Sequence, residues 1–326
     1  MEIFINVLLI IIGFVLLIKG ADFLVNGASS LAKRFNVSDI AIGLTVVAMG
    51  TSAPELVVNL IAGAEKSMAG TNDVVFGNII GSNIFNIFLI LGISAIIYPL
   101  TVHRNALWKE IPYSLVATFV FFVLVNDVLF FGASNNELSI IDGIILLIMF
   151  GIFLIYIFMN LTRNPDGELE EIVMYGSIKT TIMIALGITG LIFGGNMIVE
   201  SAVVIANLFH VSQKVIGLTI LAAGTSLPEL ATSAVAAFHK KSDLAVGNIV
   251  GSNIFNLLLV LGTTAIVHSP LMFDSVLNLD LFVVMLGTLL LFIFMFTLNK
   301  YKLDRAEGAL YLLGFAIYSY YLFIRA

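Results

Sequence analysis

The sequence has no cysteine and few charged residues. Of its 326 residues, 11% are charged and 60% are hydrophobic, and the mean hydropathy is +1.09. Soluble domains carry about 25% charged residues, so this composition excludes an ordinary soluble protein and predicts an integral membrane protein. Without cysteine there can be no disulfide, thiolate metal site or thiol nucleophile. The net charge of −6 is small for this length and favours neither nucleic acid nor an anionic lipid surface as a partner.

The sequence also lacks the short alternating segments of about 10 residues that build a transmembrane barrel. Its apolar residues form continuous runs instead, and a helical span needs about 20 such residues. We therefore predict an all-α integral membrane protein with ten transmembrane helices. The ten apolar runs are 3–26, 38–64, 74–98, 111–131, 139–160, 179–207, 214–237, 244–267, 278–298 and 307–324.

Lysine and arginine are distributed unequally between the two sets of loops. Of the 15 basic residues, 11 fall on the side reached after the odd-numbered runs, 3 on the other side, and Lys19 lies within the first run. Cytoplasmic loops collect Lys and Arg, so both termini are expected to be extracellular or periplasmic. No basic residue precedes the first run, so we expect a retained span rather than a signal peptide. Asp22 follows Lys19 by three residues and is expected to pair with it.

The chain contains two copies of the same pattern. IGLTVVAMGTSAPE (42–55) and IGLTILAAGTSLPE (216–229) match at 10 of 14 positions. VVFGNIIGSNIFNIFLILG (74–92) and LAVGNIVGSNIFNLLLVLG (244–262) match at 12 of 19 positions. Each half contributes five spans, and because five is odd, the second half enters the membrane from the opposite face. Such inverted repeats are typical of secondary transporters, which bind substrate near the bilayer midplane on interrupted helices.

These repeats define the expected organisation of the chain. We predict two inverted five-helix repeats joined by a short acidic cytoplasmic linker. In the absence of a regulatory domain or targeting segment, the expected location is a prokaryotic plasma (inner) membrane. The segments are a first repeat at 1–160 with its motif at 42–92, the linker at 161–178, and a second repeat at 179–326 with its motif at 216–262.

Each copy of the first motif places a carboxylate beside a helix-breaking proline. Pro54 and Pro228 have no N–H, so each frees a backbone carbonyl four residues earlier. Broken backbone at membrane depth is tolerated only where it faces protein or a water-filled cavity. An ionised acid at the centre of a span costs about 2.5 to 3.5 kcal/mol on insertion scales. Glu55 and Glu229 are therefore expected to face each other, neutralised by one divalent cation, two monovalent cations or two protons.

Neutral oxygen atoms surround both acids in the sequence. Hydroxyls three and four residues before each glutamate are expected on its side of the helix, and polar residues four apart form a stripe on the following span. Hard oxygen ligands without Cys or core His argue against zinc or copper and suit calcium, and sodium could use the same oxygens. The hydroxyls are Thr51, Ser52, Thr225 and Ser226, and the stripes are Asn78, Ser82, Asn86 and Asn248, Ser252, Asn256.

GTSAPE and GTSLPE, each followed by a GSNIFN segment, resemble the two alpha-repeats of the calcium/cation antiporter superfamily, specifically its sodium/calcium exchanger branch. The resemblance covers essentially the whole chain and implies alternating access of calcium and sodium to a mid-membrane site. Some members carry aspartate where this chain has Asn86 and Asn256, so two carboxylates are expected here. The implied ligands are Thr51, Ser52, Glu55, Ser82, Asn86, Thr225, Ser226, Glu229, Ser252 and Asn256, with the carbonyls of Ala48 and Ala222.

We therefore expect a secondary active antiporter that exchanges calcium for sodium, with calcium and sodium ions and the lipid bilayer as its partners. A calcium/proton antiporter using the same glutamates is the alternative. An enzyme, a cofactor, nucleic acid and an obligate protein partner are not expected. A cation channel should offer a continuous polar pore, whereas these ligands gather at one depth. Paired acids could also cleave a peptide bond, but hydroxyl-rich, proline-broken flanks fit ion coordination better than acid–base catalysis.

Overall fold

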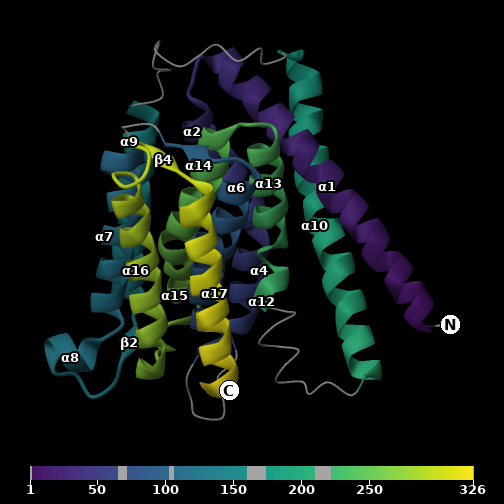
Figure 1. The fold of residues 1–326 in the computed structure, drawn as a ribbon. Coiled ribbons are helices and arrows are strands. Elements are labelled where there is room, and N and C mark those ends of the chain that lie inside the picture. The colour runs from purple at the N-terminus through teal and green to yellow at the C-terminus, as the bar shows by residue number, and fades with distance from the viewer. Residues whose placement is uncertain (1, 65–71, 103–105, 160–173, 210–221, 326) are drawn as a thin grey trace.

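The structure is a computed structural model that describes residues 2–64, 72–102, 106–159, 174–209 and 222–325, and these residues form a bundle of helices (Figure 1). The helices of the first half are α1 (Glu2–Phe35), α2 (Asp39–Ile42), α3 (Ala48–Thr51), α4 (Ala53–Ala62), α5 (Asp73–Ile84), α6 (Leu91–Ile97), α7 (Ile111–Leu124), α8 (Asp127–Phe131) and α9 (Ile140–Met159). Those of the second half are α10 (Ser177–Leu208), α12 (Ala222–Gly224), α13 (Leu227–Phe238), α14 (Ser242–Ile254), α15 (Leu261–His268), α16 (Asn278–Phe294) and α17 (Arg305–Arg325).

Every apolar run predicted from the sequence has a helical counterpart. Within the described ranges, seven helices are long and apolar enough to cross a membrane, and a bent pair is an eighth candidate. The remaining two runs correspond to α7, which continues the π-helical turn Ala106–Glu110, and to α12 with α13. The first part of run 214–237 and most of the linker 161–178 lie outside the described residues. The prediction of a helical membrane protein is confirmed.

The first motif of each half interrupts its helix, as its proline predicts. The helical pair Asp39–Thr51 and Ala53–Ala62 is bent by 44°. Ser52 sits at the bend with φ −85° and ψ 6°, and Pro54 follows in the first turn of α4, where its missing N–H costs no hydrogen bond. Ser226 has nearly the same torsion angles, φ −89° and ψ 4°, and Pro228 lies in the first turn of α13.

The second motif of each half lies on the most buried helices. The share of buried residues is 94% in an 18-residue stretch of the span Ser242–His268 and 72% in a stretch of the same length within Asp73–Ile97. Each of these spans contains a π-helical turn at the same position of the repeat, Phe85–Ile90 and Phe255–Val260. No sequence pattern predicted these turns, which occur frequently at functional sites.

Helices α1 and α10 lie against each other at one side of the bundle, tilted relative to the other helices (Figure 1). Glycines allow this close approach. A Cβ atom on Gly194 would lie 2.7 Å from the carbonyl oxygen of Gly13, and one on Gly187 would lie 2.9 Å from that of Gly20. Small residues at helix crossings are typical of membrane proteins because they let backbones come close.

Two short strand pairs join the two halves. Strand β1 (Leu100–Thr101) pairs antiparallel with β4 (Lys302–Leu303), and β2 (Glu137–Leu138) pairs antiparallel with β3 (Leu271–Met272). Each pair therefore takes one strand from each half. They are the only strands among the described residues, so the fold remains essentially all-α.

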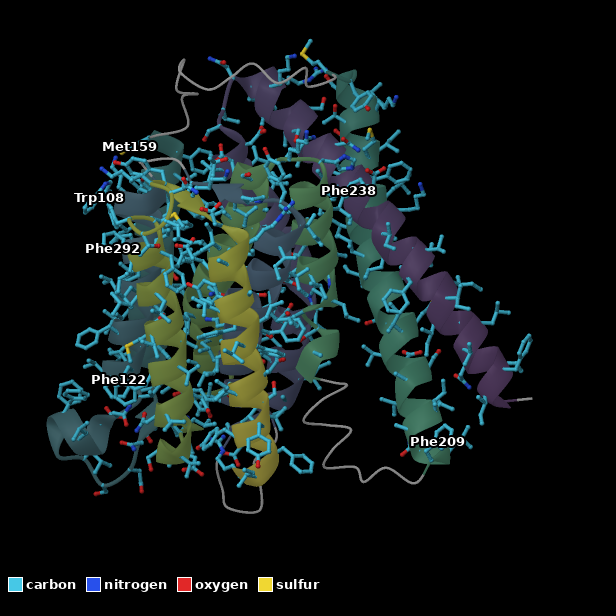
Figure 2. The ribbon with its side chains drawn as sticks, in the orientation of Figure 1. Trp108, Phe122, Met159, Phe209, Phe238 and Phe292 are labelled. Atoms are coloured by element: carbon cyan, nitrogen blue, oxygen red, sulfur yellow. The ribbon has the colours of Figure 1, made fainter. Side chains whose placement is uncertain are left out.

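The outer surface of the bundle is apolar. Large hydrophobic side chains such as Met159 and Phe209, labelled in Figure 2, are 79% and 68% exposed. Exposed side chains of this kind suit contact with lipid hydrocarbon, since lipid tails are as apolar as leucine. Most polar residues of the two motifs are in contrast buried among the helices, while Thr45, Asn78 and Thr225 are half-buried.

Candidate metal centre

The two acids of the repeated motif meet inside the protein. Glu55 lies in the first turn of α4 and Glu229 in the first turn of α13, and both are 0% exposed. The two motifs touch at this point, because Ser52, three residues before Glu55, donates a hydrogen bond to Glu229 Oε1 at 2.9 Å. Among the described residues no cluster of three or more His, Cys, Asp or Glu side chains occurs, so these two carboxylates are not joined by a third.

The hydroxyl neighbours of each acid come largely from the other half. Ser52 Oγ donates a hydrogen bond to Glu229 Oε1 at 2.9 Å, and Ser252 Oγ lies 3.5 Å from the same oxygen. Thr225 and Ser226 are in turn the hydroxyl neighbours of Glu55. Helical spacing in the sequence predicts each pair of hydroxyls on the same side of the helix as the glutamate that follows it. The bend at Ser52 breaks that helical relation and turns the hydroxyl toward the opposite half.

The threonine of each motif also reaches across to the other half. Thr51 Oγ1 donates to Asn248 Oδ1 at 3.2 Å, and Thr225 Oγ1 donates to Asn78 Oδ1 at 3.4 Å. A hydroxyl has one proton and two lone pairs. Because each threonine gives its proton to an asparagine, its lone pairs stay available as acceptors. Asn78 and Asn248 therefore support the threonines, a role that their spacing alone did not indicate.

The two supporting asparagines are held in turn by residues at equivalent positions of the repeat. Asn78 Nδ2 donates to Asn59 Oδ1 at 2.8 Å, and Asn248 Nδ2 donates to Ser233 Oγ at 2.9 Å. Asn59 and Ser233 each stand four residues after a motif glutamate. These contacts fix the side on which each asparagine presents its oxygen, because the amide nitrogen is already committed as a donor.

The remaining predicted ligands lie on the same helices. Ser82 Oγ is 3.1 Å from Ser226 Oγ. The carbonyl of Ala48 accepts the backbone N–H of Ser52 at 2.9 Å, so it is already hydrogen-bonded. Thr51 Oγ1 also lies 3.3 Å from this carbonyl and shares its single proton between it and Asn248 Oδ1. Ala222 begins α12, immediately after the undescribed residues 210–221.

Several oxygen atoms of the predicted ligands are buried and have no hydrogen-bond partner within the described part of the chain. Nearly all buried polar atoms in proteins are hydrogen-bonded, so each exception needs an explanation. All of these atoms are hard, anionic or carbonyl-type oxygens, which are the ligands that calcium and sodium accept. The atoms are Glu55 Oε1, Glu55 Oε2, Glu229 Oε2, Asn86 Oδ1 and Asn256 Oδ1.

Comparison with known proteins identifies the family. The sequence model of the sodium/calcium exchanger protein family matches residues 5–159 and 179–324. The chain belongs to the sodium/calcium exchanger family. It is a family of transporters rather than enzymes, which agrees with the expectation that the protein has no enzymatic activity.

Relatives align along most of the chain. The sodium/calcium exchanger MaX1 of Methanosarcina acetivorans is 30% identical over 358 residues, covering 98% of this chain and 99% of MaX1. The inner membrane protein YrbG of Escherichia coli is 38% identical over 270 residues, covering 79% of each chain. A solved structure of the sodium-calcium exchanger NCX_Mj, soaked with zero Na⁺ and Ca²⁺, is 33% identical with a TM-score of 0.81 and covers 96% of this chain and 97% of NCX_Mj. The ten-span inverted-repeat fold is thereby confirmed.

One expectation outside the site was wrong. Asp22 makes no ion pair with Lys19 in the described structure. Its Oδ1 lies 2.8 Å from His239 Nε2 and accepts from Asn26 Nδ2 at 3.2 Å. The contact joins α1 to the residue that follows α13, a partner 217 positions away that helical spacing cannot indicate.

Proposed function

We propose that this protein is a secondary active antiporter that exchanges calcium for sodium by alternating access, with one shared cation site at mid-membrane. The observation that carries the proposal is the convergence of Glu55 and Glu229 from inverted halves, with buried oxygens that have no protein partner in the described residues. Uncompensated buried carboxylates are costly, and a bound cation would neutralise them. The names of MaX1 and NCX_Mj support sodium and calcium as the exchanged ions.

The cation would bind to oxygens supplied by both halves. Glu55 and Glu229 would provide the charge, while the neutral ligands would adapt the cage to one calcium or to sodium. Calcium takes six to eight oxygens in flexible geometry, which a mixed set of this kind can provide. The proposed neutral ligands are the side chains of Thr51, Ser52, Ser82, Asn86, Thr225, Ser226, Ser252 and Asn256 and the carbonyls of Ala48 and Ala222.

Proton coupling is the second candidate. Two buried carboxylates whose charges interact repel each other without a cation, and protons can relieve that repulsion. The same glutamates could therefore carry protons in one direction and calcium in the other. Sodium coupling is favoured by the names of the relatives that cover nearly the whole chain.

We further propose a plasma (inner) membrane location with both termini outside. YrbG is named an inner membrane protein, which supports the location. Both termini lie toward the same end of the bundle in Figure 1, as an even number of spans requires. The excess of basic residues on the opposite side supports placing that side in the cytoplasm. The family match to 5–159 and 179–324 supports repeats at 1–160 and 179–326 joined by a linker at 161–178.

Transport by purified protein in liposomes tests these proposals. Uptake of radioactive calcium is measured with an imposed sodium gradient, with a proton gradient, and with potassium added to each. We expect uptake driven by the sodium gradient and none driven by the proton gradient. Uptake with the proton gradient alone would replace sodium by proton coupling, and flux that is independent of any counter-ion would indicate a channel.

A further inference from the structure

Four buried asparagines form hydrogen bonds between the two halves. Each GSNIFN segment contains two of them, three residues apart: Asn83 and Asn86 in the first half, Asn253 and Asn256 in the second. Asn86 Nδ2 donates to Asn253 Oδ1 at 2.9 Å, and Asn256 Nδ2 donates to Asn83 Oδ1 at 3.0 Å. All four side chains are at most 2% exposed. Each predicted ligand asparagine, Asn86 or Asn256, therefore donates a hydrogen bond to the first asparagine of the GSNIFN segment in the opposite half.

The orientation of the Asn83 amide is fixed by a backbone group. Its Nδ2 donates to the carbonyl oxygen of Asn253 at 3.4 Å. A carbonyl can only accept, so the nitrogen of the Asn83 amide must face it and the oxygen must face the other way. That oxygen meets Asn256, which therefore has to present its own nitrogen to Asn83. The Asn256 oxygen is left on the opposite side of the amide, where it is buried and has no partner in the described residues.

The hydrogen bond between the asparagines repeats with the halves exchanged, although the described residues provide no backbone acceptor for the Asn253 amide like the one that fixes Asn83. Asn86 gives its nitrogen to Asn253, and Asn86 Oδ1 is likewise buried and unpartnered within the described chain. Without such a hydrogen bond, an asparagine amide can flip and present its two N–H donors in place of its oxygen. Donors carry partial positive charge and would repel a cation, so the rotation of these two amides decides whether positions 86 and 256 can bind one.

We infer that Asn83 and Asn253 are positioning residues that hold the amide oxygens of Asn256 and Asn86 toward the cation, each acting across the pseudo-two-fold axis on the ligand of the other half. The inference rests on the proposed function and names two residues outside its ligand set. It also makes each half necessary for the coordination geometry of the other. Removing a group that orients a metal ligand costs about 10- to 100-fold in metal affinity in known sites.

A purely structural role must be distinguished, because asparagines between membrane helices also hold helices together. Aspartate at position 256 provides the means. A carboxylate has two acceptor oxygens and no donor, so it presents an oxygen to the cation in either orientation and needs no positioning residue. Asn83→Leu should therefore lower cation affinity when residue 256 is asparagine and have little effect when it is aspartate. The matched control is aspartate at position 86, which Asn83 does not contact through a side-chain hydrogen bond in the described structure.

The experiment measures binding of radioactive calcium to purified protein. It uses the single variants Asn83→Leu, Asn253→Leu, Asn86→Asp and Asn256→Asp and the four Leu/Asp double variants. We expect each leucine substitution to weaken calcium binding about 10- to 100-fold in the otherwise unchanged protein. Asn256→Asp should remove the effect of Asn83→Leu but not that of Asn253→Leu, and Asn86→Asp should do the reverse. This crossed pattern supports the inference.

Equal losses from Asn83→Leu in all three backgrounds would mean that the residue only stabilises packing and would overturn the inference. Unchanged calcium binding by both leucine variants would overturn it as well. If the wild-type protein bound no calcium, the proposed function would fail and this inference with it. If the wild-type protein binds calcium and both leucine variants bind it equally well, this inference fails but the proposed function stands.

Discussion

The two halves carry the same motifs, yet their acids have different surroundings. Glu229 accepts a hydrogen bond from Ser52 at 2.9 Å and has Ser252 at 3.5 Å. Glu55 has Thr225 and Ser226 as its hydroxyl neighbours, but neither of its oxygens is hydrogen-bonded in the described chain. The second-motif span is also more buried in the second half, 94% against 72% of the residues in an 18-residue stretch of each span. Repetition thus decides which residues meet, but it does not make their environments equal.

This inequality fits the alternating access that we propose. An in-plane pseudo-two-fold axis relates the two halves of an inverted repeat, and strict equivalence would present a central site equally to both membrane faces. One-sided access therefore requires that the halves differ. The contacts that do repeat, such as Thr51 with Asn248 and Thr225 with Asn78, are then expected to persist while the surroundings of the acids change.

The largest effects are expected at the acids themselves. Glu55→Gln and Glu229→Gln should each abolish calcium transport, because each removes half of the charge that neutralises a divalent cation. Liposome uptake of radioactive calcium checks this, with Glu200→Gln as a matched control on the exposed surface of α10. Normal exchange by either motif variant would refute the site assignment.

The same pair of variants can separate the two acids. Glu55→Gln removes a buried charge that has no hydrogen-bond partner in the described residues, so it should stabilise the cation-free protein. Glu229→Gln should stabilise it less, since Ser52 already bonds the carboxylate it replaces. Melting temperatures in detergent without sodium or calcium measure the difference. Equal shifts would mean that the two acids have equivalent environments in solution.

How much of this arrangement could be predicted from the sequence depends on how far apart the interacting residues lie in the sequence. The apolar runs, the prolines and the doubled motif predicted the spans, their breaks and the two facing glutamates, because these follow from local composition and from symmetry. The partner of Ser52 was not predictable, since the bend at Ser52 decides where its hydroxyl points. Asn83 and Asn253 were missed because their partners are about 170 residues away and share no helix with them.

The next largest effect is expected at Asn86 and Asn256, the positions at which some family members carry aspartate. Asn256→Asp adds a third carboxylate to the proposed site, so it should change how transport depends on sodium, proton and calcium concentrations. Asn86→Asp should do the same, because the two asparagines occupy equivalent positions and make equivalent hydrogen bonds. Transport assays over the three ion concentrations measure this. An unchanged dependence for Asn256→Asp would argue that it is not a ligand.

A smaller and matched loss is expected at the threonines. Thr51→Val and Thr225→Val keep the side-chain shape but remove a hydroxyl and leave an asparagine oxygen without its donor. A buried acceptor without its partner costs about 1 to 3 kcal/mol. If this cost arises only in the calcium-bound protein, it corresponds to roughly a 5- to 150-fold loss of calcium affinity. Calcium binding to purified protein measures it, and Thr189→Val on the exposed face of α10 is the control. A loss confined to one threonine would show that the repeated contacts are not functionally equivalent.

The smallest effect is expected at Asp22, an acid that belongs to neither motif. Its side chain is 35% exposed and faces His239, which is 36% exposed. Exposed ion pairs contribute about 0 to 1 kcal/mol, because water screens the charges. Asp22→Asn should therefore leave appreciable calcium transport, in contrast to the glutamine variants of the buried acids. A loss as large as that of Glu55→Gln would instead place the contact between α1 and the end of α13 on the transport cycle, and the distinction between buried and peripheral acids would fail.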